Sequence, residues 1–203
     1  KMQKINYTIK MIFFLMINFI GCLFLPEIKE VQFQNIKIIP YNKKYLNDLN
    51  NIFKSWWQNI NISKKNIYLL NIFGKKLCFL MIDENEKLIG FIFFYFSYND
   101  IKNRRIHSAF ACMQSKYRGC GYGALLSIFA WDWFTKIKWI KGISARFAID
   151  NNLSRKLHEK VGFKIIRKYF DEYIKKEKAY AICDFAISKY ELNRYYQKLK
   201  YLV

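Results

Sequence analysis

The sequence predicts an α/β fold in the broad sense (α+β), in which helices flank one mixed central sheet. The first observation is a β-hairpin signal at residues 76–98, where two apolar runs are joined by the polar turn Asp83–Lys87. The second is the alternation of apolar strands with helical segments from residue 104 to residue 187. A hairpin followed by strand–helix–strand crossovers gives a sheet with both antiparallel and parallel pairs.

Each element follows from its local pattern. A strand is expected at Ile36–Ile39, and a helix follows it because Leu49, Ile52 and Trp56 recur at helical spacing. The chain leaves room for a second helix before the hairpin. After the hairpin, the expected elements are a strand at 104–113, a helix at 123–137, a strand at 142–149, a helix at 151–161 and two final strands at 162–170 and 179–187.

The composition indicates one folded domain with a large core, because 53% of the 203 residues are hydrophobic. The five cysteines are scattered and form no CxxC pair, which argues against both a zinc ribbon and a disulfide framework. We therefore expect no metal site and a reducing, cytoplasmic environment.

The formal net charge of +20 indicates a surface that attracts anionic cofactors and partners. It does not indicate specific recognition of nucleic acid, because only seven of the 35 basic residues are arginines and the basic residues are spread along the chain. A basic protein associated with RNA or the ribosome stays open as an alternative that rests on charge alone.

The N-terminal segment, residues 1–30, is expected to stand apart from a main domain at residues 35–195. Residues 11–25 (MIFFLMINFIGCLFL) form an apolar run that follows Lys10 and ends before Pro26. This run is shorter than the roughly 20 residues that a membrane-spanning helix needs. Three alternatives stay open: a signal peptide, an anchor that tethers the protein to a membrane through residues 11–25, and a helix docked on the domain.

A glycine-rich loop precedes the helix expected at 123–137. In KYRGCGYGALL (residues 116–126), Gly119, Gly121 and Gly123 occupy alternate positions, although the chain has only 8 glycines. Glycine permits positive φ and close approach of backbone to a ligand, and a helix N-terminus attracts anions. A nucleotide P-loop would need a Gly-Lys-Ser/Thr ending, and a dinucleotide fingerprint would turn directly out of its strand; neither feature is present.

The segment MQSKYRGCGYGALL (residues 113–126) closely resembles the acyl-CoA loop of the GNAT superfamily of N-acetyltransferases. The family pattern, Arg/Gln-x-x-Gly-x-Gly/Ala, falls on Arg118, Gly121 and Gly123. A second segment, NNLSRKLHEKVGF (residues 151–163), resembles another motif of the family, and the likeness covers roughly residues 35–190. The resemblance implies a mostly antiparallel GNAT sheet whose strands splay apart at the acyl-CoA site.

The resemblance also implies the activity. Acetyl-CoA is the cosubstrate, and its acetyl group passes directly to a primary amine in a ternary complex; the amine belongs to a protein N-terminus, a lysine or a small molecule. A catalytically silent acyl-CoA-binding module at a membrane or ribosome is the alternative. The residues implied in binding acetyl-CoA are Cys112, Met113, Arg118, Gly119, Cys120, Gly121, Tyr122, Gly123, Asn151 and Ser154.

The two histidines fall on positions that the family uses for catalysis. His158 stands where many members have the tyrosine that protonates the leaving thiolate, and His107 stands where histone-type members have a general-base glutamate. Imidazole suits either task near neutral pH. The alternatives are that His158 is an aromatic packing residue and that His107 is an ordinary strand residue. Helical spacing predicts that His158 shares a face with Asn151 and Ser154, whereas Leu153 faces the core.

The amine acceptor is expected near the first helices and the end of the hairpin. Trp56, Trp57, Tyr95, Tyr98 and Asn99 lie in these regions, either as acceptor contacts or as core residues. Aromatic side chains alone do not identify the amine. The oligomeric state is likewise not encoded in any pattern of the sequence.

Overall fold

The computed structural model describes residues 2–57, 60–172 and 175–199. The strands are β1 (Val31–Phe33), β2 (Ile36–Pro40), β3 (Cys78–Asp83), β4 (Leu88–Tyr95), β5 (Arg105–Met113), β6 (Gly142–Ala148), β7 (Lys164–Asp171) and β8 (Lys176–Asp184). The helices are α1 (Met2–Leu23), α2 (Leu46–Trp56), α3 (Lys64–Leu77), α4 (Tyr98–Lys102), α5 (Tyr122–Thr135), α6 (Asn152–Lys160) and α7 (Phe185–Leu199), with short 3₁₀ helices at Lys43–Tyr45 and Ser115–Tyr117.

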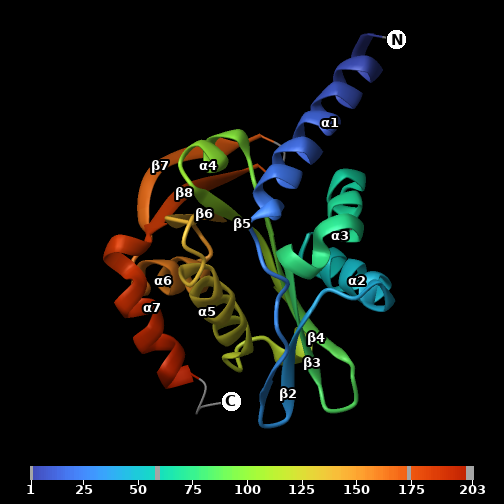
Figure 1. Ribbon diagram of the computed structural model, residues 1–203. Coiled ribbons are helices and arrows are strands. Elements are labelled where there is room, and N and C mark those ends of the chain that lie inside the picture. Colours follow the sequence, from blue (N-terminus) through green and yellow to red (C-terminus); the bar gives the residue numbers. More distant parts are fainter. Residues whose placement is uncertain (1, 58–59, 173–174, 200–203) are drawn as a thin grey trace.

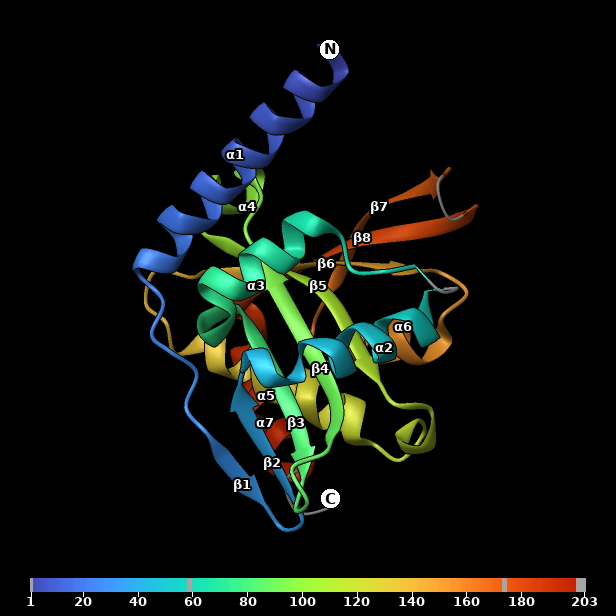
Figure 2. The same ribbon diagram turned by 90° about the vertical axis from the view of Figure 1, so that its right-hand side faces the viewer.

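The sheet confirms the predicted fold class. Among the described residues it has eight strands in the order β1-β2-β3-β4-β5-β6-β8-β7. Each neighbouring pair in it is antiparallel except β5 and β6. Figures 1 and 2 show α2 and α3 on one face and α5 and α7 on the opposite face. A mixed, mostly antiparallel sheet between helical layers is the arrangement that the sequence predicts.

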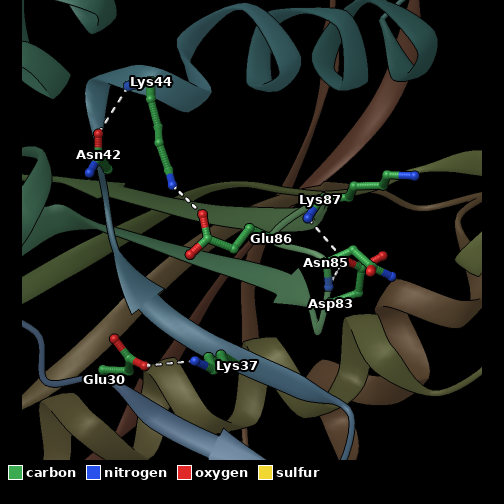
Figure 3. Close-up of polar contacts among 8 residues, drawn as sticks. All are labelled: Glu30, Lys37, Asn42, Lys44, Asp83, Asn85, Glu86 and Lys87. Atoms are coloured by element: carbon green, nitrogen blue, oxygen red, sulfur yellow. Dashed lines mark hydrogen bonds and ion pairs between the residues drawn. The ribbon is translucent and has the colours of Figure 1, made fainter.

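The hairpin of β3 and β4 closes through the predicted turn (Figure 3). The carboxylate of Asp83 accepts hydrogen bonds from the backbone N–H groups of Asn85 (3.0 Å) and Lys87 (2.9 Å). Glu86 adopts a left-handed φ of 57°, and its carboxylate pairs with Lys44 at 2.6 Å. Because both side chains of this ion pair are exposed, it orients the turn against the segment before α2 rather than stabilising the fold.

The core is centred on β3 and β4, which are buried on both faces and therefore read as nearly continuous apolar runs. Phe79 and Phe94 are fully buried and both contact Phe134 of α5, with ring centroids 5.9 Å and 4.7 Å away. These contacts hold α5 against the sheet. The start of α5, where the glycine loop lies, is thereby fixed relative to the strands.

The C-terminal end differs from the prediction. The strand expected at 179–187 ends at Asp184, and Phe185 begins α7. The carboxylate of Asp184 accepts a hydrogen bond from the N–H group of Ala186 at 3.0 Å, which satisfies one of the free donors at the start of the helix. Phe185 and Leu192 are buried in α7. An Asp before an apolar pattern of helical spacing is a helix-start signal that the strand prediction overlooked.

The helix α1 has one face packed on the domain and one exposed face. In the C-terminal half, the side chain of the fully buried Asn18 donates to the carbonyl of Phe96 (3.0 Å) and accepts from its N–H group (2.7 Å). Further apolar side chains on α1 are between 48% and 60% exposed: Ile9, Ile12, Phe13, Met16, Phe19 and Ile20. In Figures 1 and 2 the start of α1 extends well beyond the sheet. No helix within the described ranges has both the length and the apolar character that crossing a bilayer needs.

Candidate active site

The site is built around the point where β5 and β6 separate. These parallel strands pair from Arg105 opposite Gly142 to Ser108 opposite Ala145, and there the ladder ends. β5 nevertheless continues to Met113, while its other edge stays paired with β4 beyond an irregularity between Phe93 and Phe94. The backbone edge of β5 that faced β6 is therefore left without a strand partner. Unpaired backbone donors and acceptors at such an edge suit a ligand that carries amide groups.

The glycine loop reaches α5 through two glycines with positive φ. The φ angles are 82° at Gly119 and 84° at Gly121, and Gly121 directly precedes the helix. A Cβ atom at either position would meet nothing within 4 Å, so the requirement for glycine is the backbone conformation and not crowding within the protein. No side chain of the described residues caps the first N–H groups of α5. These groups and the positive end of the helix form a place for an anion.

Several predicted residues meet at the carbonyl of Met113, at the end of β5. The indole N–H group of Trp56 donates to this carbonyl at 2.7 Å, and Nε of Arg118 donates to it at 3.3 Å. The Arg118 guanidinium also lies 4.1 Å from the Trp56 ring centroid and donates to Ser55 Oγ at 2.9 Å. A ligand that pairs with the Met113 carbonyl has to displace one of these donors. Trp56 is thus a neighbour of the glycine loop, which its position in the sequence did not reveal.

The start of α6 lies apart from this cluster in the chain but carries two more predicted residues. Asn151 caps the helix, since its side-chain oxygen accepts from the N–H group of Ser154 at 3.1 Å. The predicted helix faces are wrong for Leu153, which is 80% exposed and not directed at the core. His158 shares a face with Ser154 as predicted, since its Nδ1 lies 3.4 Å from Ser154 Oγ, and it is the buried residue of the helix. Leu153 lies in the first turn of α6, which is exposed.

The ring of His158 lies in an aromatic cage. Its centroid is 5.0 Å from Trp131, 4.6 Å from Phe147 and 4.7 Å from Phe163. Nδ1–H donates to the backbone carbonyl of Ser154 at 2.7 Å, which leaves Nε2 without a proton in the neutral ring. Burial lowers the pKa of His158 to about 4, although the Ser154 carbonyl opposes this shift. At neutral pH the ring is uncharged, so the geometry favours the packing interpretation, and the thiolate-protonating role stays a prediction.

His107 belongs to a buried chain of polar groups. Ser144 Oγ donates to the carboxylate of Asp100 at 2.7 Å and lies 2.8 Å from Nδ1 of His107. The serine has given its only proton to Asp100, so His107 Nδ1–H donates to Ser144 Oγ, and Nε2 is the basic nitrogen. Asp100 is held in place by Ser97, with which it forms the capping box of α4. The sequence analysis did not foresee Asp100 and Ser144, because they come from distant elements.

The electrostatics of His107 follow from these neighbours. Burial lowers the pKa of His107 to about 4; the negative charge of Asp100 opposes the shift and the positive charge of Arg146 adds to it. The ring is therefore neutral throughout the physiological range, and the burial that lowers its pKa also makes it a weaker base than a free imidazole. Burial also raises the pKa of Cys112 to about 12, so this thiol carries no charge and is not an activated nucleophile.

The predicted acceptor residues divide into two groups. The Trp57 ring lies 6.1 Å from Phe110 of β5, and Tyr95 lies 4.8 Å from His107, so both are close to the site. Tyr98 and Asn99 instead lie on α4, where Tyr98 is 60% exposed and faces Phe13 of α1. Over the residues that the structure describes, no group of acidic, histidine or cysteine side chains could hold a metal ion.

A sheet whose strands β5 and β6 separate, with a glycine loop and an uncapped helix start beside the separation, is the arrangement that the sequence analysis expects of an acyltransferase. The model of the Acetyltransferase (GNAT) family matches residues 46–163, which is more than half of the chain. The chain therefore belongs to the GNAT acetyltransferase family. No curated protein matches the sequence significantly.

Solved structures share the fold at low identity. One is a chain of the NatC complex bound to Gag peptide and CoA, with 20% identity, a TM-score of 0.61 and coverage of 74% of this chain and 98% of that one. Another is the ribosomal-protein-S5-alanine acetyltransferase from Vibrio fischeri, with 17% identity, a TM-score of 0.64 and coverage of 80% and 100%. A third is spermidine N-acetyltransferase SpeG from Vibrio cholerae, with 16% identity, a TM-score of 0.59 and coverage of 80% and 99%.

Proposed function

We propose that this protein is an N-acetyltransferase that moves the acetyl group of acetyl-CoA to a primary amine by direct attack in a ternary complex. The observation that carries the proposal is the glycine loop at the start of α5, directly after the unpaired edge of β5. The glycine loop supplies backbone N–H donors for a pyrophosphate. The open edge of β5 supplies backbone donors and acceptors for the amide groups of a pantetheine arm. Two similar structures, a complex with bound CoA and peptide and a spermidine N-acetyltransferase, support an amine acceptor.

In this proposal, the N–H groups of residues 119–123 bind the pyrophosphate, and Arg118 adds positive charge beside them. The backbone of β5 up to Met113 holds the pantetheine arm, with Cys112 contributing its backbone and not its thiol. Asn151 and Ser154 at the start of α6 contact the same arm. Acetyl-CoA supplies the activated thioester.

The amine must lose a proton before it attacks, because an alkyl ammonium has a pKa near ~10. Nε2 of His107 is the acceptor we assign to this proton, directly or through one water. The Asp100–Ser144 pair keeps the proton on Nδ1 and so keeps Nε2 free. Backbone N–H groups at the open edge of β5 would stabilise the oxyanion that forms when the amine attacks. Collapse of this oxyanion breaks the C–S bond and releases CoA as a thiolate, which takes up a proton from solvent.

The loop assignment predicts that Gly121→Val weakens acetyl-CoA binding at least about tenfold, or 1.4 kcal/mol. The free protein should still fold, because a Cβ at this position meets no atom within 4 Å. The expected loss arises from the φ of 84°, which valine resists, and from a side chain in the space that the pyrophosphate needs. Isothermal titration calorimetry with acetyl-CoA measures the affinity.

Gly121→Asn is the matched control, because asparagine tolerates positive φ and so isolates the steric effect. Wild-type affinity in both variants would contradict the loop assignment. The catalytic part is tested separately by the release of free CoA in the presence of amines. Binding of acetyl-CoA without any amine-dependent release would instead identify the silent acyl-CoA-binding module.

We also propose that the exposed apolar face of α1 contacts an anionic membrane surface. Large apolar side chains that are about half exposed are concentrated on this helix, and the chain carries a net charge of +20. Such a combination is typical of a helix that lies in the interface of a bilayer.

Changing Ile12 and Met16 together to Glu should lower sedimentation with phosphatidylserine vesicles at least about tenfold, because apolar contact area is lost and negative charge is added. The amine-dependent release of CoA should not change. Ile166→Glu is the control, since Ile166 is 58% exposed but lies on β7. The membrane contact is wrong if the wild-type protein does not sediment with these vesicles or if all variants sediment equally.

A further inference from the structure

Two arginines flank one tyrosine ring on the sheet. Arg146 of β6 lies opposite Tyr180 of β8, and Arg167 of β7 lies opposite the same tyrosine. The guanidinium carbons are 5.9 Å and 5.6 Å from the centroid of the Tyr180 ring. Because neighbouring strands are about 4.8 Å apart, the backbones that carry the two arginines are about 10 Å apart. Three strands thus present two positive charges with a flat ring between them.

These two charges have no carboxylate partner among the described residues. Neither Arg146 nor Arg167 forms an ion pair there, and both side chains are exposed. The next positive charge on this face, Lys178, is already paired with Asp171 at 2.8 Å. Lys178 also lies 5.9 Å from the ring of Trp57, which brings the end of α2 to this part of the sheet. The arginine pair therefore presents uncompensated positive charge to whatever binds between α2 and the β7–β8 hairpin.

The arginine pair lies beside the proposed base. Ser144 and Arg146 are two residues apart on β6, so their side chains share one face of the sheet, and His107 is the neighbour of Ser144 across the ladder. The Arg146 charge is near enough to His107 to contribute to the lowering of its pKa. Two residues of a strand span roughly 7 Å, so the backbone position of the first arginine is about this far from that of Ser144, the partner of His107.

We infer that the amine acceptor is an acidic peptide, whose N-terminal amine reaches His107 while a carboxylate of the following residues binds Arg146 and Arg167. A guanidinium binds a carboxylate through two parallel hydrogen bonds, which makes it selective for this group. In a free α-amino acid a single carbon separates the amine from the carboxylate, which is too short for this span. A side-chain carboxylate on the second or third residue of a peptide is far enough from the N-terminal amine to fit this span. The inference rests on the proposed function and names its acceptor.

The test compares two acceptors that differ only in charge, a peptide that begins Ser-Glu-Glu and one that begins Ser-Gln-Gln. The wild-type protein should use the acidic peptide with a kcat/KM on the order of tenfold higher, because complementary charge favours encounter and binding. Arg167→Gln and Arg146→Gln should each raise the KM for the acidic peptide several-fold. The KM for the neutral peptide and for acetyl-CoA should stay the same.

Lys168→Gln is the matched control, because Lys168 is the exposed neighbour of Arg167 on the opposite face of β7. It should leave the preference for the acidic peptide unchanged. Equal use of both peptides by the wild-type protein, or an equal loss on both in the arginine variants, would overturn the inference while leaving the acetyltransferase activity intact. Absence of CoA release with every peptide and amine would count against the proposed function itself.

Discussion

His107→Gln should lower kcat for acetyl transfer about 100-fold, which is within the range that a general base contributes. Glutamine can still donate a hydrogen bond to Ser144 Oγ, so the buried chain to Asp100 keeps a partner at this position. It has no basic nitrogen to accept the proton of the amine. The affinity for acetyl-CoA, measured by calorimetry, should not change. Full activity in this variant would show that a water or another group removes the proton.

The pH profile gives a second readout for the same residue. Protonation of Nε2 abolishes its basic function, so activity should fall as the pH decreases through the pKa of His107, which is about 4. Without the structure, this limb would be expected near the ordinary value of ~6.5. Asp100→Asn removes the charge that raises this pKa and should move the limb to lower pH. Arg146→Gln removes a charge that lowers it and should move the limb upward, when a neutral acceptor is used.

His158→Phe should keep most of the acetyl transfer, whereas His158→Ala should cost about 3 kcal/mol of unfolding free energy. Phenylalanine fills the cage of Trp131, Phe147 and Phe163, and alanine leaves it partly empty. Chemical denaturation measures the stability, and release of CoA measures the activity. A folded His158→Phe variant without activity, rescued by His158→Tyr, would instead support the role in protonating the thiolate.

The variant His158→Phe should also change how the unfolding free energy depends on pH in the acidic range. The pKa of His158 is lowered to about 4 in the folded protein from an ordinary 6.5, so the unfolded chain binds the proton more readily. Stability should therefore be highest above pH 6.5 and fall as the pH decreases from 6.5 to 4, by about 1.4 kcal/mol per pH unit for each such histidine. His107 should behave in the same way. His158→Phe should remove about half of this slope, and an unchanged slope would contradict the assignment of the buried neutral ring.

The features that could be predicted are those that neighbouring residues encode. The turn after Asp83 and the glycines before α5 are local patterns, and the structure has both. The partners of His107 could not be predicted, because Asp100 and Ser144 are 44 residues apart and meet only through the tertiary fold. Likewise, nothing near Trp56 in the chain indicates that it bonds to Met113.

The errors have physical reasons as well. Leu153 was wrongly assigned to the core side of α6, because helical spacing defines faces but not which face meets the core. Leu153 lies in the first turn, at the exposed start of the helix. The predicted strand was extended too far, beyond Asp184, because a short apolar run is equally compatible with a strand and with a buried helix.

The early end of the ladder between β5 and β6 divides the sheet into two hydrogen-bonded blocks, β1–β5 and β6–β8. The two blocks are joined by the residue pairs from Arg105–Gly142 to Ser108–Ala145 of β5 and β6. A ligand whose amide groups form hydrogen bonds with the open edge of β5 would take the place of a neighbouring strand where β6 has separated from β5. Bound cosubstrate would then stabilise the folded state, and the gain in unfolding free energy would increase with the cosubstrate concentration.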